Sequence, residues 1–184
     1  MEGSEVKNMG ICRAASVLLL LSAPILLGAE AKTLKVLQFG PVAVGKQAPA
    51  LASWDLEDRV VTLAGLLKEE KTRAVLLAFY ATWCKECRSG LQVLESGKDK
   101  LVQGGIRVLL VDHGEDKETV SAFHRQMRLT LPVVLDEFKE ISGAYGVRGL
   151  PRAFLIGKDG TVRAIYVSEG ADFAEQLLKD ADAR

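Results

Sequence analysis

Residues 74–87 read AVLLAFYATWCKEC, an apolar run that leads directly into two cysteines, Cys84 and Cys87. Seven apolar residues in succession predict a strand that is buried on both faces of a sheet. A helical pattern begins at Lys85, extends to about Gln103, and ends at a pair of glycines. The stretch therefore predicts a buried strand followed by a helix whose first turn carries the cysteine pair.

The spacing of the two cysteines suits redox chemistry. Residues three positions apart at a helix start lie on one face, about 5 Å apart, which is within disulfide reach. Cys84 would stand at the helix N-terminus, where unpaired N–H groups and the helix dipole favour a thiolate, the form that attacks disulfides. Lys85 adds a positive charge beside it and Glu86 opposes that effect, so both are expected to tune the pKa of Cys84. Cys87, one turn further into the helix, suits the resolving role.

Strand and helix patterns continue on both sides of this stretch. They are a small hairpin (54–63), a second buried strand (106–111), an amphipathic helix (116–128), a short strand (131–135), a helical turn (138–143), two strands joined by Asp159-Gly160 (153–156 and 162–167) and a closing helix (173–181). This order predicts an α/β fold, a three-layer α/β/α sandwich with a mixed central sheet and an N-terminal β-hairpin extension.

Three segments together resemble the TlpA-like and ResA-like thioredoxins of the AhpC/TSA–redoxin superfamily. They are VGKQAP (44–49), FYATWCKEC (79–87) and GVRGLPRAFLI (146–156). The resemblance covers about residues 44–182, and it implies a thioredoxin fold with a cis Leu150–Pro151 bond facing the disulfide. It also implies that Trp83, Leu150 and Pro151 form the surface on which a substrate docks as an added strand.

The same resemblance implies an enzyme, a thiol–disulfide oxidoreductase that exchanges its dithiol with protein thiols and disulfides. The implied direction is reductive, in support of thiol proteins such as c-type cytochromes, with a membrane or periplasmic electron donor. No cofactor is expected beyond the Cys84–Cys87 disulfide itself. Two positions depart from the pattern, because Ala78 and Gly90 stand where such proteins commonly carry an acid. Glu86 is then the only carboxylate within the motif.

The first 31 residues have the order of a secretory signal. A weakly basic start precedes an uncharged, leucine-rich stretch (14–29), and Ala29-Glu30-Ala31 forms a small-x-small cleavage site. An uncleaved membrane anchor through residues 14–29 is the alternative, although the stretch falls short of the ~20 residues that span a bilayer. Both interpretations place the folded part in the periplasm or elsewhere outside the cytoplasm. The expected division is a signal peptide (1–31), a lead-in (32–43) and a thioredoxin-like domain (44–184).

Charge and histidine content argue against two other classes of protein. Lys and Arg total 24, as do Asp and Glu, so the basic excess of a nucleic-acid binder is missing. A structural zinc site needs four ligands. Beyond the leader the chain offers Cys84 and Cys87 with His113 and His124, which stand eleven apart on an expected loop and an expected helix. We expect no metal, and we expect both histidines to be exposed.

Two alternatives share the general fold. A peroxiredoxin-like peroxidase also carries a threonine two residues before its cysteine, as Thr82 precedes Cys84, but the upstream proline of such a site is missing nearby. A non-enzymatic copper carrier of thioredoxin fold would space its cysteines one residue wider and add a late histidine, yet no histidine follows Pro151. Both remain secondary to disulfide exchange.

Overall fold

The computed structural model describes residues 42–167, 176, 179 and 180. The expected signal peptide and most of the lead-in lie outside this part of the chain. The expected closing helix is described only at residues 176, 179 and 180, which are helical. Within the described ranges, none of the helices combines the length and the apolar character needed to cross a bilayer.

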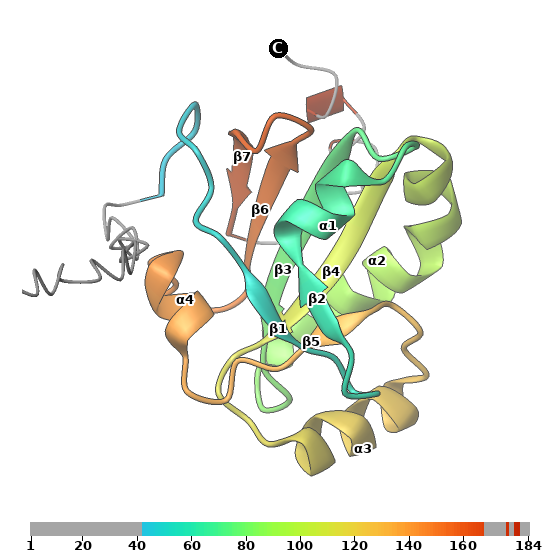
Figure 1. The fold of residues 1–184 in the computed structure, drawn as a ribbon. Helices are drawn as coiled ribbons and strands as arrows, with labels where there is room; N and C mark the ends of the chain where they lie inside the picture. Colours follow the sequence, from blue (N-terminus) through green and yellow to red (C-terminus); the bar gives the residue numbers. More distant parts are fainter. Residues whose placement is uncertain (1–41, 168–175, 177–178, 181–184) are drawn as a thin grey trace, which may run out of the picture. The chain divides into compact units, whose positions relative to one another are not determined.

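A five-stranded mixed sheet in the order β5-β4-β3-β6-β7 forms the centre of the fold (Figure 1). Its strands are β3 (Ala74–Tyr80), β4 (Ile106–Asp112), β5 (Val133–Val134), β6 (Arg152–Gly157) and β7 (Val162–Tyr166). Strands β3, β4 and β5 run parallel, whereas β6 and β7 pair antiparallel. Every residue of β3 is buried, as the unbroken apolar run predicts for a strand in the middle of a covered sheet.

Helices cover both faces of this sheet. Alternate residues of β3 point to opposite faces, so Leu76 joins one core cluster and Leu77 joins the other. The first cluster contains buried residues of α2 (Lys85–Gln103) and α3 (Lys117–Met127). The second contains residues of α1 (Leu63–Lys68) and α4 (Glu140–Ala144). The expected three-layer α/β/α sandwich is confirmed.

The expected N-terminal hairpin is also present, as β1 (Ala52–Trp54) and β2 (Val60–Thr62). It lies along the edge strand β5, because the N–H of Leu135 donates to the carbonyl of Trp54 at 3.0 Å and Asp55 forms a bridge with Val134. The hairpin therefore covers an edge that would otherwise expose unpaired backbone groups.

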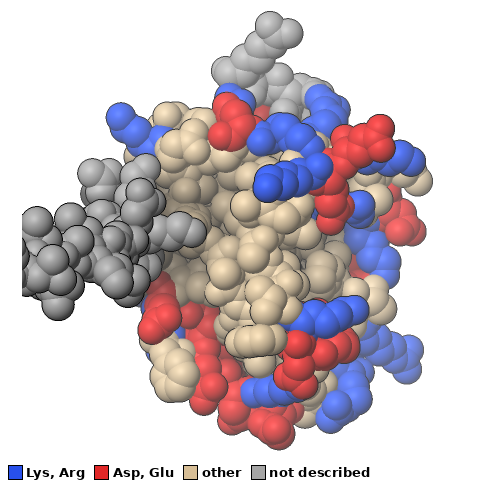
Figure 2. All heavy atoms as spheres, viewed as in Figure 1, with Lys and Arg blue, Asp and Glu red and all other residues tan. Residues whose placement is uncertain are grey.

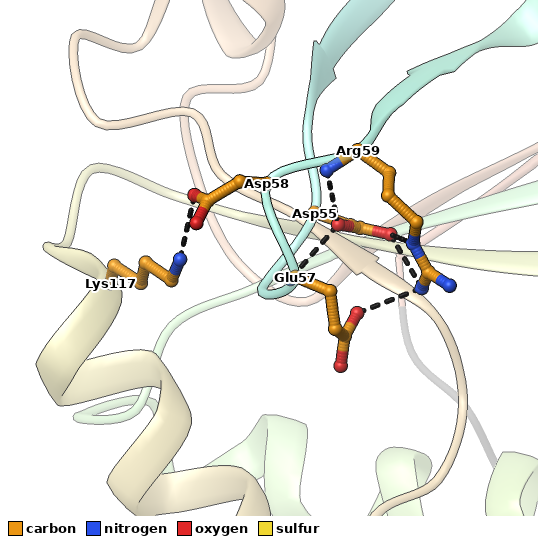
Figure 3. Close-up of polar contacts among 5 residues, drawn as sticks. All are labelled: Asp55, Glu57, Asp58, Arg59 and Lys117. Carbon is orange, nitrogen blue, oxygen red and sulfur yellow. Dashed lines mark hydrogen bonds and ion pairs between the residues drawn. The ribbon is translucent and has the colours of Figure 1, made fainter.

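A single carboxylate organises the tip of the hairpin (Figure 3). Asp55 accepts hydrogen bonds from the backbone N–H groups of Glu57 and Arg59 and from the Nε of Arg59, at 2.8–2.9 Å. At the other side of the tip, Lys117 at the start of α3 pairs with Asp58 at 2.6 Å. The tip is thus joined to the helix that packs beside the cysteine-bearing end of the sheet.

Local capping explains where two of the helices begin. Asp116 caps α3 by accepting from the N–H of Thr119 at 2.7 Å, and α3 ends at Arg128, which has a left-handed backbone with φ +54°. Helix α1 is a finding that the sequence patterns did not predict. It is only six residues long, and Thr62 caps it through a 2.9 Å bond from the N–H of Gly65.

Acidic and basic side chains are interspersed around an uncharged centre on the face shown in Figure 2. The exception is the lower left of this face, where acidic side chains predominate.

Candidate active site

Cys84 and Cys87 form a disulfide at the start of α2, with an S–S distance of 2.05 Å and Cα atoms 5.4 Å apart. Cys84 is the N-cap of the helix, and its Sγ accepts a hydrogen bond from the N–H of Cys87 at 3.2 Å. Both cysteines are buried, with 3% of Cys84 and 1% of Cys87 exposed. In the reduced protein the same N–H and the helix N-terminus would favour a thiolate on Cys84.

The register of the sheet brings the other candidate segments to the same edge. Tyr80, at the end of β3, pairs with Asp112 at the end of the parallel strand β4. Strand β6 runs antiparallel to β3, so its first residue, Arg152, pairs with Phe79. The end of β3, the loop after β4 and the residues just before β6 therefore share one edge of the sheet with the disulfide.

The expected docking residues lie at this edge. The Leu150–Pro151 bond is cis, which confirms the expectation from the resemblance, and both residues are half-buried. Trp83 is 64% exposed beside Cys84. Lys85 and Glu86 are also exposed, in the first turn of α2. Their effects on Cys84 and the docking role of Trp83, Leu150 and Pro151 remain proposals.

A pair of acidic residues that sequence reasoning missed holds the loop before the cysteines. The Glu115 carboxylate accepts from the backbone N–H of Thr82 at 2.6 Å and from its hydroxyl at 2.5 Å. The N–H of Glu115 in turn donates to Asp112 at 2.8 Å. From the other side, the guanidinium of Arg88 donates to the Thr82 carbonyl at 3.2 Å. The sequence does carry one signal for these acids, since Asp112 ends a buried strand. The ends of parallel strands meet at one edge of a sheet, so an acid at that position is expected near the edge that carries the cysteines.

The two histidines are not brought together with the cysteines, and the expectation that both are exposed is wrong. His124 is buried, with its Nε2 2.7 Å from the hydroxyl of Tyr80. It lies on the buried side of α3 together with Phe123, whereas Ala122, on the other side of Phe123, is exposed. His113 is half-buried, with its Nδ1 2.7 Å from the hydroxyl of Ser142. Each candidate zinc ligand thus has another partner.

A groove of about 600 Å³ lies between the hairpin tip and the C-terminal part of α3. Its lining includes Arg59, His124, Arg128 and Pro132, but neither cysteine. The disulfide therefore lies outside this groove.

Comparisons with known proteins agree with this arrangement. The AhpC/TSA family matches residues 44–165. Thiol-disulfide oxidoreductase ResA of Bacillus thuringiensis (strain Al Hakam) is 36% identical over 126 residues, which are 68% of this chain and 70% of ResA. ResA of Geobacillus kaustophilus is 32% identical over 155 residues, which are 84% of this chain and 85% of that protein.

Among solved structures, the thioredoxin domain of a thiol-disulfide oxidoreductase from Bacteroides vulgatus superimposes with a TM-score of 0.67. It is 23% identical, and the match covers 77% of this chain and 99% of that domain. The likeness shows that the sandwich described above is a thioredoxin fold. The chain belongs to the AhpC/TSA family and is a thiol–disulfide oxidoreductase similar to ResA.

Proposed function

We propose that the Cys84–Cys87 pair is the redox centre of this oxidoreductase and that it reduces disulfides of protein partners outside the cytoplasm. The observation that supports this most directly is the disulfide itself, with Cys84 as the N-cap of α2 and an exposed Trp83 beside it. An N-cap position lowers the pKa of a cysteine and so prepares it for attack.

The exchange needs two steps, which balance without a cofactor. The Cys84 thiolate attacks one sulfur of the partner's disulfide, a mixed disulfide forms, and the other partner sulfur leaves as a thiolate. Cys87 then loses its proton and attacks the Sγ of Cys84, which releases the second partner thiol and closes the Cys84–Cys87 disulfide. A dithiol donor at the membrane or in the periplasm would reduce the pair again.

The finer parts of this proposal follow from the resemblance to TlpA-like and ResA-like thioredoxins. They are the reductive direction, a part in c-type cytochrome maturation, and export by the N-terminal 31 residues, cleaved or retained as an anchor. Docking of the partner against Trp83, Leu150 and Pro151 belongs to the same set. An exposed tryptophan beside a disulfide at a sheet edge suits the capture of an extended segment.

Two cysteine variants test the roles of the pair. Cys84→Ser should abolish insulin reduction, whereas Cys87→Ser should accumulate mixed disulfides that a reductant releases. Turnover by Cys87→Ser at the wild-type rate would contradict the resolving role. The potential of the couple tests the direction, because a value near about −270 mV fits a reductant and one near about −120 mV fits an oxidant.

A further inference from the structure

Asp112 stands out among the buried polar residues. Its side chain is completely buried at the end of β4. Among the residues that the structure describes, its Oδ1 is the only buried side-chain nitrogen or oxygen without a hydrogen-bond partner. Buried polar atoms are nearly always paired, so an unpaired carboxylate oxygen calls for a physical explanation.

A proton on Asp112 supplies that explanation. Burial raises the pKa of Asp112 to about 7. The backbone N–H of Glu115 opposes this shift, whereas the charge of the Glu115 carboxylate and its hydrogen bond to the protonated form raise the pKa further. A neutral Asp112 can donate to Glu115, but two charged carboxylates cannot bond to each other. The pair is therefore able to hold one proton at neutral pH.

A continuous set of contacts joins Asp112 to the loop that leads into the cysteine pair. The same Glu115 carboxylate accepts hydrogen bonds from the N–H and the hydroxyl of Thr82, two residues before Cys84. Asp112 also pairs in register with Tyr80, and Tyr80 belongs to the core cluster that contains both cysteines. Register partners in parallel strands point to the same face, so Asp112 points to the face that carries the disulfide.

We propose that Asp112 is a positioning residue for disulfide exchange, and that the proton it shares with Glu115 couples the redox state of the Cys84–Cys87 pair to pH. The inference rests on Cys84 and Cys87 being the redox pair. Reduction adds two electrons from a donor dithiol and one proton, giving a thiolate on Cys84 and a thiol on Cys87. The new negative charge favours the protonated pair, so a second proton is taken up by Asp112 and Glu115. Oxidation reverses both steps.

The other titratable groups around Asp112 change charge elsewhere on the pH scale. Burial raises the pKa of Tyr80 far above its usual value, and the charges of Asp112 and Glu115 add to that shift. Burial lowers the pKa of His124, on α3, to about 4. On the loop, His113 contacts Ser142. Burial lowers the pKa of His113, and the positive charge of Lys139 lowers it further. Arg88, on α2, donates to the Thr82 carbonyl.

The test replaces Asp112 by asparagine, which keeps the volume and can donate to Glu115 but cannot titrate. The matched control is Glu118→Gln, which removes an acid that is exposed on α3. Alkylation of Cys84 in the reduced proteins is followed from pH 5 to 10. We expect two transitions in the wild type and in Glu118→Gln. Asp112→Asn should show a single transition for Cys84, displaced to lower pH because a neighbouring negative charge is gone.

A second measurement uses the wild-type protein and does not depend on how the variant folds. Carbon-13 NMR should show the Asp112 carboxyl titrating near neutrality, at a higher pH in the reduced protein than in the oxidised one. An Asp112 that titrates at the ordinary aspartate value, or equally in both redox states, would overturn the inference. So would an Asp112→Asn profile that superimposes on the wild type while insulin reduction is normal. If the wild type reduces no insulin at all, the proposed redox role and this inference fail together.

Discussion

The Nε2 of His124 lies 2.7 Å from the hydroxyl of Tyr80, and this contact joins α3 to the strand that leads into the disulfide. Both side chains are buried, and the ring of Phe123 stacks on Tyr80 with centroids 5.9 Å apart. A buried histidine that bonds a tyrosine hydroxyl is held neutral, because burial disfavours its charged form.

This contact predicts an acid-sensitive stability. Burial lowers the pKa of His124 to about 4, whereas the unfolded chain takes up the proton at about 6.5. The unfolded state thus binds more protons between these values, and the free energy of unfolding falls as pH drops from 6.5 to 4. His124→Gln should reduce this fall by about 2–3 kcal/mol, measured by urea denaturation at pH 7 and pH 4. His113 is present in both proteins, so its contribution cancels. An equal loss of free energy of unfolding between pH 7 and pH 4 in the two proteins would contradict the prediction.

The contacts of Glu95 predict a second pH dependence of the free energy of unfolding, separate from that of His124. Its carboxylate accepts from the N–H and hydroxyl of Thr130, from the N–H of Leu131 and from Lys98, at 2.5–3.1 Å. These bonds lower the pKa of Glu95 to about 2, against an opposing effect of burial that is the largest single cause. The stabilisation is present above pH 4.5 and is lost as pH falls through 2.

Replacing Glu95 by glutamine removes the charge and weakens the bonds between α2 and the segment after α3. The free energy of unfolding at pH 7 should fall by about 2 kcal/mol, as for other hydrogen bonds to charged groups. Glu118→Gln, which changes an exposed acid, should stay within about 0.5 kcal/mol of the wild type. Equal losses in the two variants would show that net charge, and not these contacts, matters.

Much of the fold could be predicted from local patterns. The strand at residues 74–80 and the helix at 85–103 have the predicted bounds, because an apolar run and a pair of glycines mark their limits clearly. The helix expected at 116–128 is Lys117–Met127 with the two end residues as caps. Strand β5 is shorter than expected, at two residues, because only Val133 and Val134 pair with β4.

The parts that could not be predicted depend on contacts between distant residues. The sequence patterns do not single out Asp112 and Glu115, and only the register with Tyr80 and the bonds to Thr82 connect them to the loop before the cysteines. His124 follows Phe123 on an amphipathic helix. Whether the position before or after Phe123 faces the sheet depends on how α3 packs. The sequence therefore revealed the cysteine pair but not the two acids that hold the loop before it.

Because Trp83 is exposed, replacing it should affect the binding of a partner much more than the stability of the fold. A side chain that is 64% exposed contributes little to the core, so Trp83→Ala should change the free energy of unfolding by less than about 0.5 kcal/mol. The value of kcat/KM for a protein disulfide should fall several-fold, with less effect on a small aromatic disulfide that needs no docking surface. Trp54, which is 56% exposed on β1, gives the matched control. Equal losses for Trp54→Ala and Trp83→Ala would contradict a docking role.

Lys85 and Glu86 should move the pKa of Cys84 in opposite directions. Both side chains are exposed in the first turn of α2, next to the cap that Cys84 provides. A positive charge favours a thiolate and a negative charge disfavours it, so Lys85→Ala should raise the pKa of Cys84 and Glu86→Ala should lower it.

Alkylation of the reduced proteins as a function of pH measures both shifts. In the wild type the midpoint should lie below the free-cysteine value of about 8.5, since the helix N-terminus and Lys85 together outweigh Glu86. Because both groups are exposed, each shift should shrink as salt is raised toward 1 M. The lowering of the Cys84 pKa by the helix terminus and the N–H of Cys87 should persist at high salt. Shifts of the same sign in the two variants, or a wild-type Cys84 that alkylates no faster than glutathione at neutral pH, would rule out this account of its reactivity.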